Sequence, residues 1–305
     1  MEEQPNTGLD SKRLAVVTGA NKGIGHEICR QLLLNGLKVI LTARDEIRGL
    51  DAVSGLKKSG FSDVGFHHLD VTNSVSIAVL ADFIKTRYGK LDILVNNAGI
   101  GSGVVLDADG LKDLIVRTGK LEGEEAHSMG IIQESYSLSE ECLNTNYSGS
   151  KAVTEALIPL LQLSKSPRIV NVSSRMGLLQ SITHERARKQ LADVDHLTEE
   201  RIGVVLEWFL KDYKEDKLKD HGWPLPLTGY TVSKAALNAY TRLLAKRHGS
   251  FCINAVCPGF VKTDINSNIG FLTVEEGARG PVKLALLPDG GPSGQFFTET
   301  ELASF

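Results

Sequence analysis

The fold of this chain is decided by one stretch near its start, Leu14-Ala15-Val16-Val17-Thr18-Gly19-Ala20-Asn21-Lys22-Gly23-Ile24-Gly25. Its first five residues are apolar or β-branched, which predicts a buried strand. After the glycines, apolar residues at Ile28 and 32–34 predict a helix that ends at Asn35-Gly36. A strand, a glycine-rich turn and a helix in this order form the context in which such a turn binds a dinucleotide.

The spacing of the turn is Gly-x-x-x-Gly-x-Gly rather than the commoner Gly-x-Gly-x-x-Gly, and the same physical argument applies to both. Small residues let the backbone approach a pyrophosphate, and the helix N-terminus offers free N–H groups to the anion. A glycine turn without a ligand is the alternative. The candidate cofactor-binding residues of this turn are Gly19, Asn21, Lys22, Gly23, Ile24 and Gly25.

The end of the second predicted strand, residues 38–42, indicates which dinucleotide binds. NAD enzymes carry an acidic residue there, which bonds the adenosine ribose. This chain has Ala43-Arg44 instead, and Lys22 lies in the glycine turn. Two cations suit a 2′-phosphate, so we expect NADPH. Asp45 directly after Arg44 would weaken this preference, and two solvated cations are the alternative interpretation.

Further strands alternate with helices along the rest of the chain. Strands are expected at 64–71, 91–95, 168–174, 253–257 and 294–298, and helices near 49–58, 73–84, 139–161, 230–244 and 273–287. This alternation predicts an α/β fold, a Rossmann-like doubly wound parallel sheet of about seven strands in the order 3-2-1-4-5-6-7. Helices would cover both faces, and ligands would bind where the strand C-termini share one edge.

Tyr230 and Lys234 lie four residues apart at the start of a strong helix pattern. Positions i and i+4 share one face of a helix, so the two side chains should project together. A nearby cation lowers the pKa of a phenol from about 10, which gives a better proton donor for neutral pH. The alternative is an ordinary amphipathic helix start with the lysine in solvent.

The composition limits the classes of function. The chain has 305 residues and a net charge of -3, which gives no reason to expect nucleic acid or an anionic membrane as a partner. No apolar run reaches the length of a membrane span, and residues 1–8 lack the features of a signal or transit peptide. The four cysteines show no CxxC spacing, so we expect reduced core thiols, no metal site and a cytoplasmic location.

Five motifs together resemble the short-chain dehydrogenase/reductase family. They are Thr18-Gly19-Ala20-x-x-Gly23-Ile24-Gly25, Asp70-Val71, Asn96-Asn97-Ala98-Gly99, Tyr230-x-x-x-Lys234 and Pro258-Gly259. Their order and positions on the sheet match that family over nearly the whole chain. Two insertions and short stretches such as 21–25 and 284–288 are similar to the extended plant menthone reductase and salutaridine reductase group, near the monomeric carbonyl reductases.

The resemblance implies an NADPH-dependent carbonyl reductase. Tyr230 would donate a proton, Lys234 would bond the nicotinamide ribose, and Ser174, rather than Ser173, would position the carbonyl oxygen. Asn146, rather than Asn144, would hold a water that relays protons to Lys234. Further cofactor contacts are expected from Asp70, Val71, Asn97, Ala98, Gly99, Pro258, Gly259, Val261 and Thr263, with Tyr230 and Lys234 also touching the cofactor.

The insertions are expected at about 100–137 and 180–227 within one domain spanning residues 1–305. We interpret the first as a loop or short helical extension. The second is highly charged and has helix-like apolar spacing, which predicts a lid helix, with a solvated surface insertion as the alternative. Short members of the family dimerise through the helices that bear Asn146 and Tyr230. The second insertion would cover that face, so we expect a monomer.

Few residues of the sequence indicate what lines the substrate pocket. Met176, Leu179 and Phe271 are candidate apolar liners, although each would also suit a core position. An apolar cyclic ketone, terpenoid-like or alkaloid-like, or the corresponding secondary alcohol is the expected substrate class. Two other functions are considered. One is reduction of a conjugated C=C bond, for which the family replaces the tyrosine by an acid; the other is a non-catalytic NADPH-binding partner or sensor.

Overall fold

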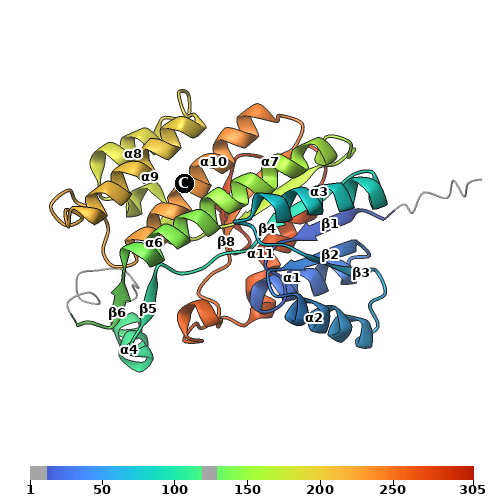
Figure 1. Cartoon of the computed structure of the whole chain (residues 1–305), viewed down its shortest axis with the longest axis horizontal. Coiled ribbons are helices and arrows are strands. Elements are labelled where there is room, and N and C mark those ends of the chain that lie inside the picture. The colour runs from blue at the N-terminus through green and yellow to red at the C-terminus, as the bar shows by residue number, and fades with distance from the viewer. Residues whose placement is uncertain (1–11, 119–128) are drawn as a thin grey trace, which may run out of the picture.

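A central sheet of eight strands organises the chain (Figure 1). The structure is a computed structural model that describes residues 12–118 and 129–305. The sheet order is β10-β9-β8-β7-β4-β1-β2-β3. The strands are β1 (Leu14–Val17), β2 (Lys38–Ala43), β3 (Val64–His68), β4 (Ile93–Asn96), β7 (Arg168–Val172), β8 (Cys252–Cys257), β9 (Phe296–Thr298) and β10 (Glu301–Ala303).

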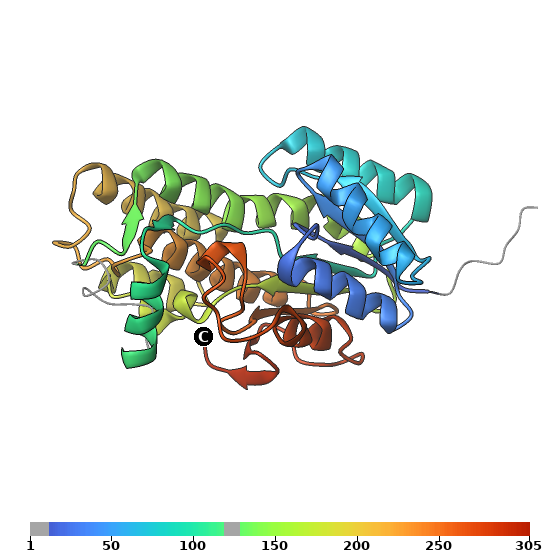
Figure 2. The ribbon, with the colours of Figure 1, turned by 90° about the horizontal axis from the view of Figure 1, so that it is seen from below.

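Seven of these strands are parallel and have the predicted order 3-2-1-4-5-6-7, which confirms the fold class. The expectation of about seven strands missed one, because β10 adds an antiparallel edge strand to β9. The three residues of β10 are half-buried or exposed and show no apolar run, so its sequence carries no strand signal. Figure 2 shows this red antiparallel pair on the far side of the sheet from the blue strands.

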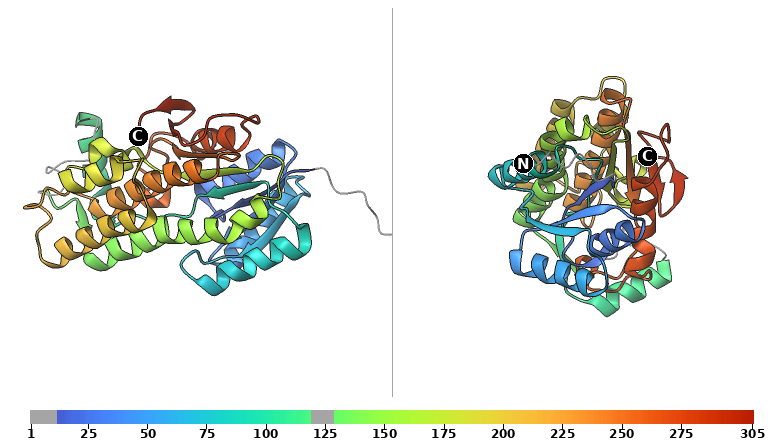
Figure 3. Two further views of the ribbon diagram at one scale, coloured as in Figure 1. Left: turned by 90° about the horizontal axis from the view of Figure 1, so that it is seen from above. Right: turned by 90° about the vertical axis from the view of Figure 1, so that its right-hand side faces the viewer.

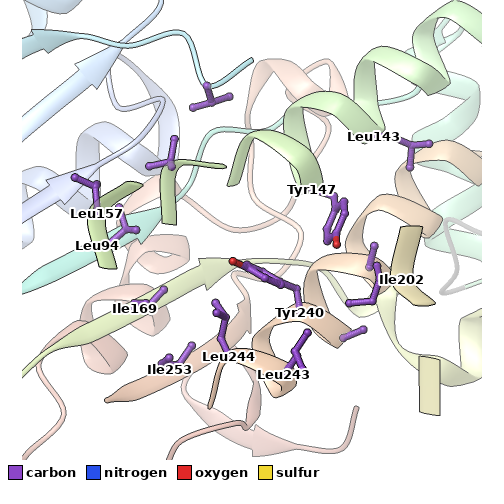
Figure 4. Close-up of a cluster of buried hydrophobic side chains, with 14 of the residues drawn as sticks. Leu94, Leu143, Tyr147, Leu157, Ile169, Ile202, Tyr240, Leu243, Leu244 and Ile253 are labelled. Atoms are coloured by element: carbon purple, nitrogen blue, oxygen red, sulfur yellow. The ribbon is translucent and has the colours of Figure 1, made fainter. Parts of the chain in front are cut away.

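Helices cover both faces of the sheet, as expected for parallel strands that are buried on both sides. Helices α1 (Gly23–Leu34), α2 (Glu46–Lys58) and α11 (Val274–Ala285) belong to one core. Helices α3 (Ser74–Tyr88), α7 (Ser150–Leu161) and α10 (Thr228–Arg247) belong to the other. Figure 4 shows the second core, where Leu94, Ile169 and Ile253 from the strands lie to the left of Tyr147 and Tyr240.

Helix starts differ from the predictions by about one turn where a polar cap precedes them. Helix α6 (Tyr136–Leu143) begins before the predicted Ser139, because the Ser135 side chain accepts a hydrogen bond from the Leu138 N–H. A π-helical segment, Asn144–Gly149, continues this helix into α7. Helix α2 begins at Glu46, since Asp45 caps it by accepting from the Arg48 N–H.

The first insertion contains more structure than the expected loop or helical extension. It forms β5 (Gly103–Val105), α4 (Ala108–Thr118) and β6 (Ile132–Glu134), and the two strands pair antiparallel. A separate apolar cluster joins Leu111 and Leu114 of α4 to Ile132 and to Ile269 of a distant loop. Short strands of three residues lack a readable alternation, so the hairpin was not predicted. Residues 119–128, a part of this insertion, lie outside the described residues. So do residues 1–8, in which no features of a signal or transit peptide were predicted.

The second insertion is helical, as its apolar spacing predicted. It forms α8 (Glu185–Ala192) and α9 (Glu199–Lys214), with short 3₁₀ turns at Arg175–Gly177 and Leu179–Ser181 before them. Ile202, Val205 and Phe209 of α9 are buried in the same core as α10. Figure 3 shows the yellow helices lying along α10 and α6, which they contact.

No helix in the described ranges is long and apolar enough to cross a membrane.

Phe209 should be important for holding this insertion on the core, because its ring is buried and packs edge-on against Trp223 and Tyr213. We predict that Phe209→Ala lowers the free energy of unfolding by about 3–5 kcal/mol, from lost burial and the cavity it leaves. Urea denaturation measures this. Leu163→Ala, at a side chain that is 62% exposed, is the control and should change stability by less than about 0.5 kcal/mol. Equal effects of the two variants would contradict the packing described.

Candidate active site

The glycine-rich turn lies against the end of β4 so closely that only glycine fits. Gly19 and Gly23 have φ values of 61° and 58°, in the left-handed region. A Cβ on Gly19 would lie 2.8 Å from the Cα of Ala98, and one on Gly25 would lie 2.4 Å from Nδ2 of Asn97. The turn therefore adopts a conformation that side chains would prevent.

The Asn96-Asn97-Ala98-Gly99 motif supports this turn through its hydrogen bonds. The Asn97 side chain donates to the backbone oxygens of Thr18 and Gly19. The Thr18 hydroxyl accepts from the backbone N–H groups of Asn97 and Ala98, at 3.0 and 2.9 Å. The end of β4 thus fixes the shape of the turn at the carboxyl edge of the sheet.

Helix α10 brings Tyr230 and Lys234 to the same edge. Lys234 is buried, and its Nζ donates to the backbone oxygen of Val172 at 2.9 Å. The same Nζ lies 5.6 Å from the centre of the Tyr230 ring. Tyr230 is half-buried, and the Ser174 hydroxyl lies close enough to its phenol to lower the phenol's pKa in part. The structure therefore brings these three predicted residues together.

Asn146 lies close to Lys234, and both side chains approach Gly99. A Cβ on Gly99 would lie 3.2 Å from Oδ1 of Asn146 and 3.5 Å from Nζ of Lys234. The Asn146 side chain donates to the Ile100 oxygen and to the Ser233 hydroxyl, each at 3.0 Å, and accepts from the Ile100 N–H. Asn144 is exposed. The geometry supports the choice of Asn146, which lies in a π-helical segment of the kind common at functional sites.

The two serines after β7 have different environments. Ser173 is buried and donates to the Asn238 side chain at 2.6 Å, whereas Ser174 faces Tyr230 and accepts from the Met176 N–H. Asn238 also donates to the Gly177 oxygen and so clamps the segment that carries both serines. Asn238 was not predicted, although an amide side chain one turn beyond Lys234 on the same helix face was the available signal.

Burial dominates the electrostatics of the pair. It raises the pKa of the Tyr230 phenol, an effect that neighbouring Cys257 and Cys142 strengthen and the Ser174 hydrogen bond opposes. Burial also lowers the pKa of the Lys234 ammonium to about 8. The expectation that Lys234 would lower the phenol's pKa is therefore wrong in direction. A raised pKa keeps the phenol protonated at neutral pH, which is the form that donates a proton.

At the adenosine end, the cations and acids have separate partners. Arg44 is exposed directly after β2, while Asp45 is engaged as the α2 cap and in an ion pair with Arg48 at 3.3 Å. Although burial acts to raise the pKa of Asp70, hydrogen bonds from Thr72 and the charge of Arg44 hold it below its usual value. Val71 is buried against Gly149. Asp45 therefore competes little with a phosphate for Arg44.

Lys22 forms an unexpected ion pair with Asp264, at 2.5 Å. Both side chains are more than half exposed, so the pair contributes at most about 1 kcal/mol and a phosphate would readily displace Asp264. The Thr263 methyl group lies near Gly23. The segment after β8 therefore reaches across the edge of the sheet to the glycine turn.

This segment holds the remaining predicted nicotinamide contacts. Pro258 is buried, and Gly259 has a φ of 84°, where a Cβ would lie 2.4 Å from the Leu272 side chain. Val261 forms an isolated parallel bridge with Leu272. Thr263 caps the short 3₁₀ turn that follows, with Asn266 bonding back to its N–H.

The three predicted substrate residues are dispersed. Met176 is buried next to Ser174, and Leu179 packs against the core that contains α9. Phe271 is 53% exposed and packs edge-on against Phe260, with 5.6 Å between ring centres. The structure therefore places Leu179 and Phe271 in different clusters. Leu178, another apolar residue of this stretch, belongs to the core with Phe296.

The four cysteines are all free and buried. In the described part of the chain, no group of three or more His, Cys, Asp or Glu side chains is arranged to hold a metal ion.

Comparison with known families shows which family the chain belongs to. A sequence profile described as short chain dehydrogenase matches residues 13–185. The chain belongs to the short-chain dehydrogenase/reductase family. A second profile, described as Enoyl-(Acyl carrier protein) reductase, matches residues 221–284.

Relatives within the short-chain dehydrogenase/reductase family share most of their length with this chain. The (+)-neomenthol dehydrogenase of Arabidopsis thaliana is 54% identical, covering 97% of this chain and 99% of the relative. The solved structure of salutaridine reductase from Papaver somniferum is 53% identical with a TM-score of 0.85, covering 94% of this chain and all of that one. Carbonyl reductase [NADPH] 1 of Rattus norvegicus is 37% identical, covering 95% of this chain and 97% of the relative.

These findings confirm the predicted group, the oxidoreductase class acting on ketones and alcohols, and the NADPH/NADP+ cofactor. The glycine turn fits such a cofactor. Helix α1 has no side-chain cap and no acidic residue in its first turn, so neither competes with an anion such as a pyrophosphate for its first N–H groups.

The lowered pKa of Lys234 predicts how ketone reduction depends on pH. We predict that the protonated ammonium is the active form, so kcat/KM should be constant at acidic to neutral pH and fall as pH rises through about 8. Tyr230 stays protonated over that range because its pKa is raised. Initial rates with NADPH across this range provide the measurement. Lys234→Arg keeps its positive charge at higher pH, so any fall in kcat/KM should move to a higher pH. A wild-type profile that is flat up to about pH 10 would contradict the assignment.

Proposed function

We propose that this enzyme reduces an apolar cyclic ketone, terpenoid-like or alkaloid-like, to a secondary alcohol with NADPH, or catalyses the reverse oxidation. The observation that carries the proposal is the close approach of the Tyr230 and Ser174 hydroxyls beside the buried Lys234, whose Nζ lies 5.6 Å from the centre of the Tyr230 ring. A hydroxyl pair next to a buried cation suits protonation of a carbonyl oxygen. Relatives that are named neomenthol dehydrogenase and salutaridine reductase support the substrate class.

The proposed mechanism assigns one task to each side chain. When bound, NADPH supplies the hydride that attacks the carbonyl carbon. The Ser174 hydroxyl donates a hydrogen bond to the carbonyl oxygen and orients it. Tyr230 donates a proton to the developing alkoxide, which is worth about 10²–10⁴-fold in rate. Lys234 bonds the nicotinamide ribose, and Asn146 holds a water that returns protons through Lys234.

The cofactor would lie along the carboxyl edge of the sheet, from Arg44 to Thr263. Arg44 and Lys22 would hold the 2′-phosphate, and the α1 N-terminus would hold the pyrophosphate. The residues that we propose to contact it are Gly19, Asn21, Lys22, Gly23, Ile24, Gly25, Arg44, Asp70, Val71, Asn97, Ala98, Gly99, Tyr230, Lys234, Pro258, Gly259, Val261 and Thr263. Met176, Leu179 and Phe271 remain the proposed substrate contacts.

Tyr230→Phe tests the central role. The variant keeps the ring but loses the proton donor, so turnover should fall by about 10²–10⁴-fold while NADPH binding stays nearly unchanged. NADPH absorbance over a panel of cyclic ketones, together with NADPH fluorescence titration, provides the two readouts. Chiral analysis of the products, with an enone in the panel, separates ketone reduction from C=C reduction. Ketone reduction at the wild-type rate in the variant would exclude Tyr230 as the donor.

We also propose that residues 1–305 form a single domain and that the protein is monomeric and cytoplasmic. Helices α8 and α9 pack on α10, and α9 also packs on α6, so the face that bears the Tyr230 and Asn146 helices is covered within the chain. The buried, unpaired cysteines suit a reducing compartment.

Light scattering coupled to size exclusion tests the oligomeric state. We expect the mass of one chain, about 33.1 kDa, at all loading concentrations. A stable dimer mass would overturn the proposal of a monomer.

A further inference from the structure

The helix that carries Tyr230 lacks a cap of its own. Helix α10 begins at Thr228, and its N-cap residue is Leu227, with a φ of 62° and no side-chain cap. The first N–H groups of a helix have no partner within the helix, and a polar N-cap side chain ordinarily satisfies one of them. Leucine cannot do so, and Tyr230 lies within this first turn.

Two side chains of the first insertion satisfy these groups instead. Glu134 at the end of β6 accepts from the N–H groups of Thr228, at 3.0 Å, and Gly229, at 3.4 Å. Ser102, just before β5, accepts from the Tyr230 N–H at 3.0 Å and donates its own proton to Glu134. The first three N–H groups of the helix, those of residues 228–230, therefore bond to residues 94–128 positions earlier in the chain.

The hairpin aligns these two side chains. Glu134 pairs with Gly103 across the β5–β6 ladder, which places it next to Ser102. A carboxylate at the N-terminus of a helix is also favoured by the helix dipole. Two residues before Ser102, the backbone of Ile100 both donates to and accepts from the Asn146 side chain. One short segment thus contacts Asn146 through its backbone and Tyr230 through Ser102.

We propose that Glu134, acting through Ser102, is a positioning residue that sets where Tyr230 stands relative to Ser174 and Lys234. The proposal rests on the proposed role of Tyr230 as proton donor. Its physical basis is that the Tyr230 backbone N–H is held by Ser102, which Glu134 in turn orients. Release of this turn moves the phenol away from Ser174, and small misplacements of a catalytic group cost large factors in rate.

The test compares Glu134→Ala, Glu134→Gln and Ser102→Ala with the wild type and a matched control. Asn73→Ala is the control, because Asn73 caps α3 through two N–H groups, of Val75 and Ser76, on a helix without site residues. We expect Glu134→Ala to lower kcat by about 10- to 100-fold per NADPH-binding site. The Kd for NADPH and the KM for the ketone should each change by less than about threefold, since neither ligand touches Glu134.

The conservative variant separates positioning from simple stability. The carbonyl oxygen of a glutamine can accept from Thr228, and its amide can donate to the Ser102 hydroxyl, which has two acceptor sites. Glu134→Gln should therefore recover kcat to within about fivefold of the wild type, and Ser102→Ala should lose at least about fivefold. Asn73→Ala should lower the thermal midpoint but leave kcat per NADPH-binding site unchanged.

The outcomes distinguish this proposal from the proposed function. If Tyr230→Phe keeps turnover, the role of Tyr230 fails and the positioning role fails with it. If Tyr230→Phe is inactive but Glu134→Ala keeps the wild-type kcat per NADPH-binding site, only the positioning role fails. Where Glu134→Ala does not fold, the same result for Ser102→Ala leads to the same conclusion. Proportional losses of kcat, NADPH sites and thermal stability in all Glu134 and Ser102 variants would likewise show a structural role alone and overturn the proposal.

Discussion

Helix α10 reaches the carboxyl edge of the sheet because a glycine at each of two contacts lets it approach its neighbours closely. A Cβ on Gly177 would lie 2.5 Å from the backbone of Lys234, and one on Gly229 would lie 2.7 Å from the Ser139 side chain. These two glycines let the segment after β7 and helix α6 lie directly against α10. Ser174 and Asn146 come from those two neighbours, so their distances to Tyr230 and Lys234 depend on this close packing. The distances between these side chains are therefore set by how closely the backbones pack rather than by the polar residues themselves.

Several polar groups buried under this packing bond to one another, although Oδ1 of Asn96 has no hydrogen-bond partner among the described residues. The Asn96 side chain donates to both Thr154 and Asn171, and Asn171 in turn donates to Thr241, each at 2.8 Å. This chain of bonds crosses from α7 through β4 and β7 to α10. Buried amides that are satisfied in this way fix one arrangement of their elements, because any shift would leave a polar group without a partner. The sheet edge therefore offers a rigid base on which a buried ammonium, that of Lys234, can be retained.

The parts of the structure that could be predicted are those whose signal is local. Buried parallel strands appear as apolar runs, so seven strands and their order followed from residues such as those of β1, and the glycine turn and the Tyr230–Lys234 spacing indicated the site. The hairpin and Glu134 could not be predicted, since their partners lie far away in sequence and three-residue strands have no pattern. The pKa of Tyr230 was predicted in the wrong direction, because spacing reveals a neighbouring charge but not the extent of burial. Lys22 looked like a free cation because Asp264 is distant in the chain.

The packing of α9 on α10 has a consequence for the behaviour of the protein on dilution. In a dimer, the burial of a helix face depends on the concentration of subunits, and dilution exposes it. Here the covering helix is tethered to α10 through residues 215–227 of the same chain, so its effective concentration is constant. Ile202 and Phe209 therefore cover the outer side of α10 equally well at nanomolar and millimolar protein. An enzyme built in this way keeps the surroundings of its catalytic helix regardless of how scarce it is in the cell.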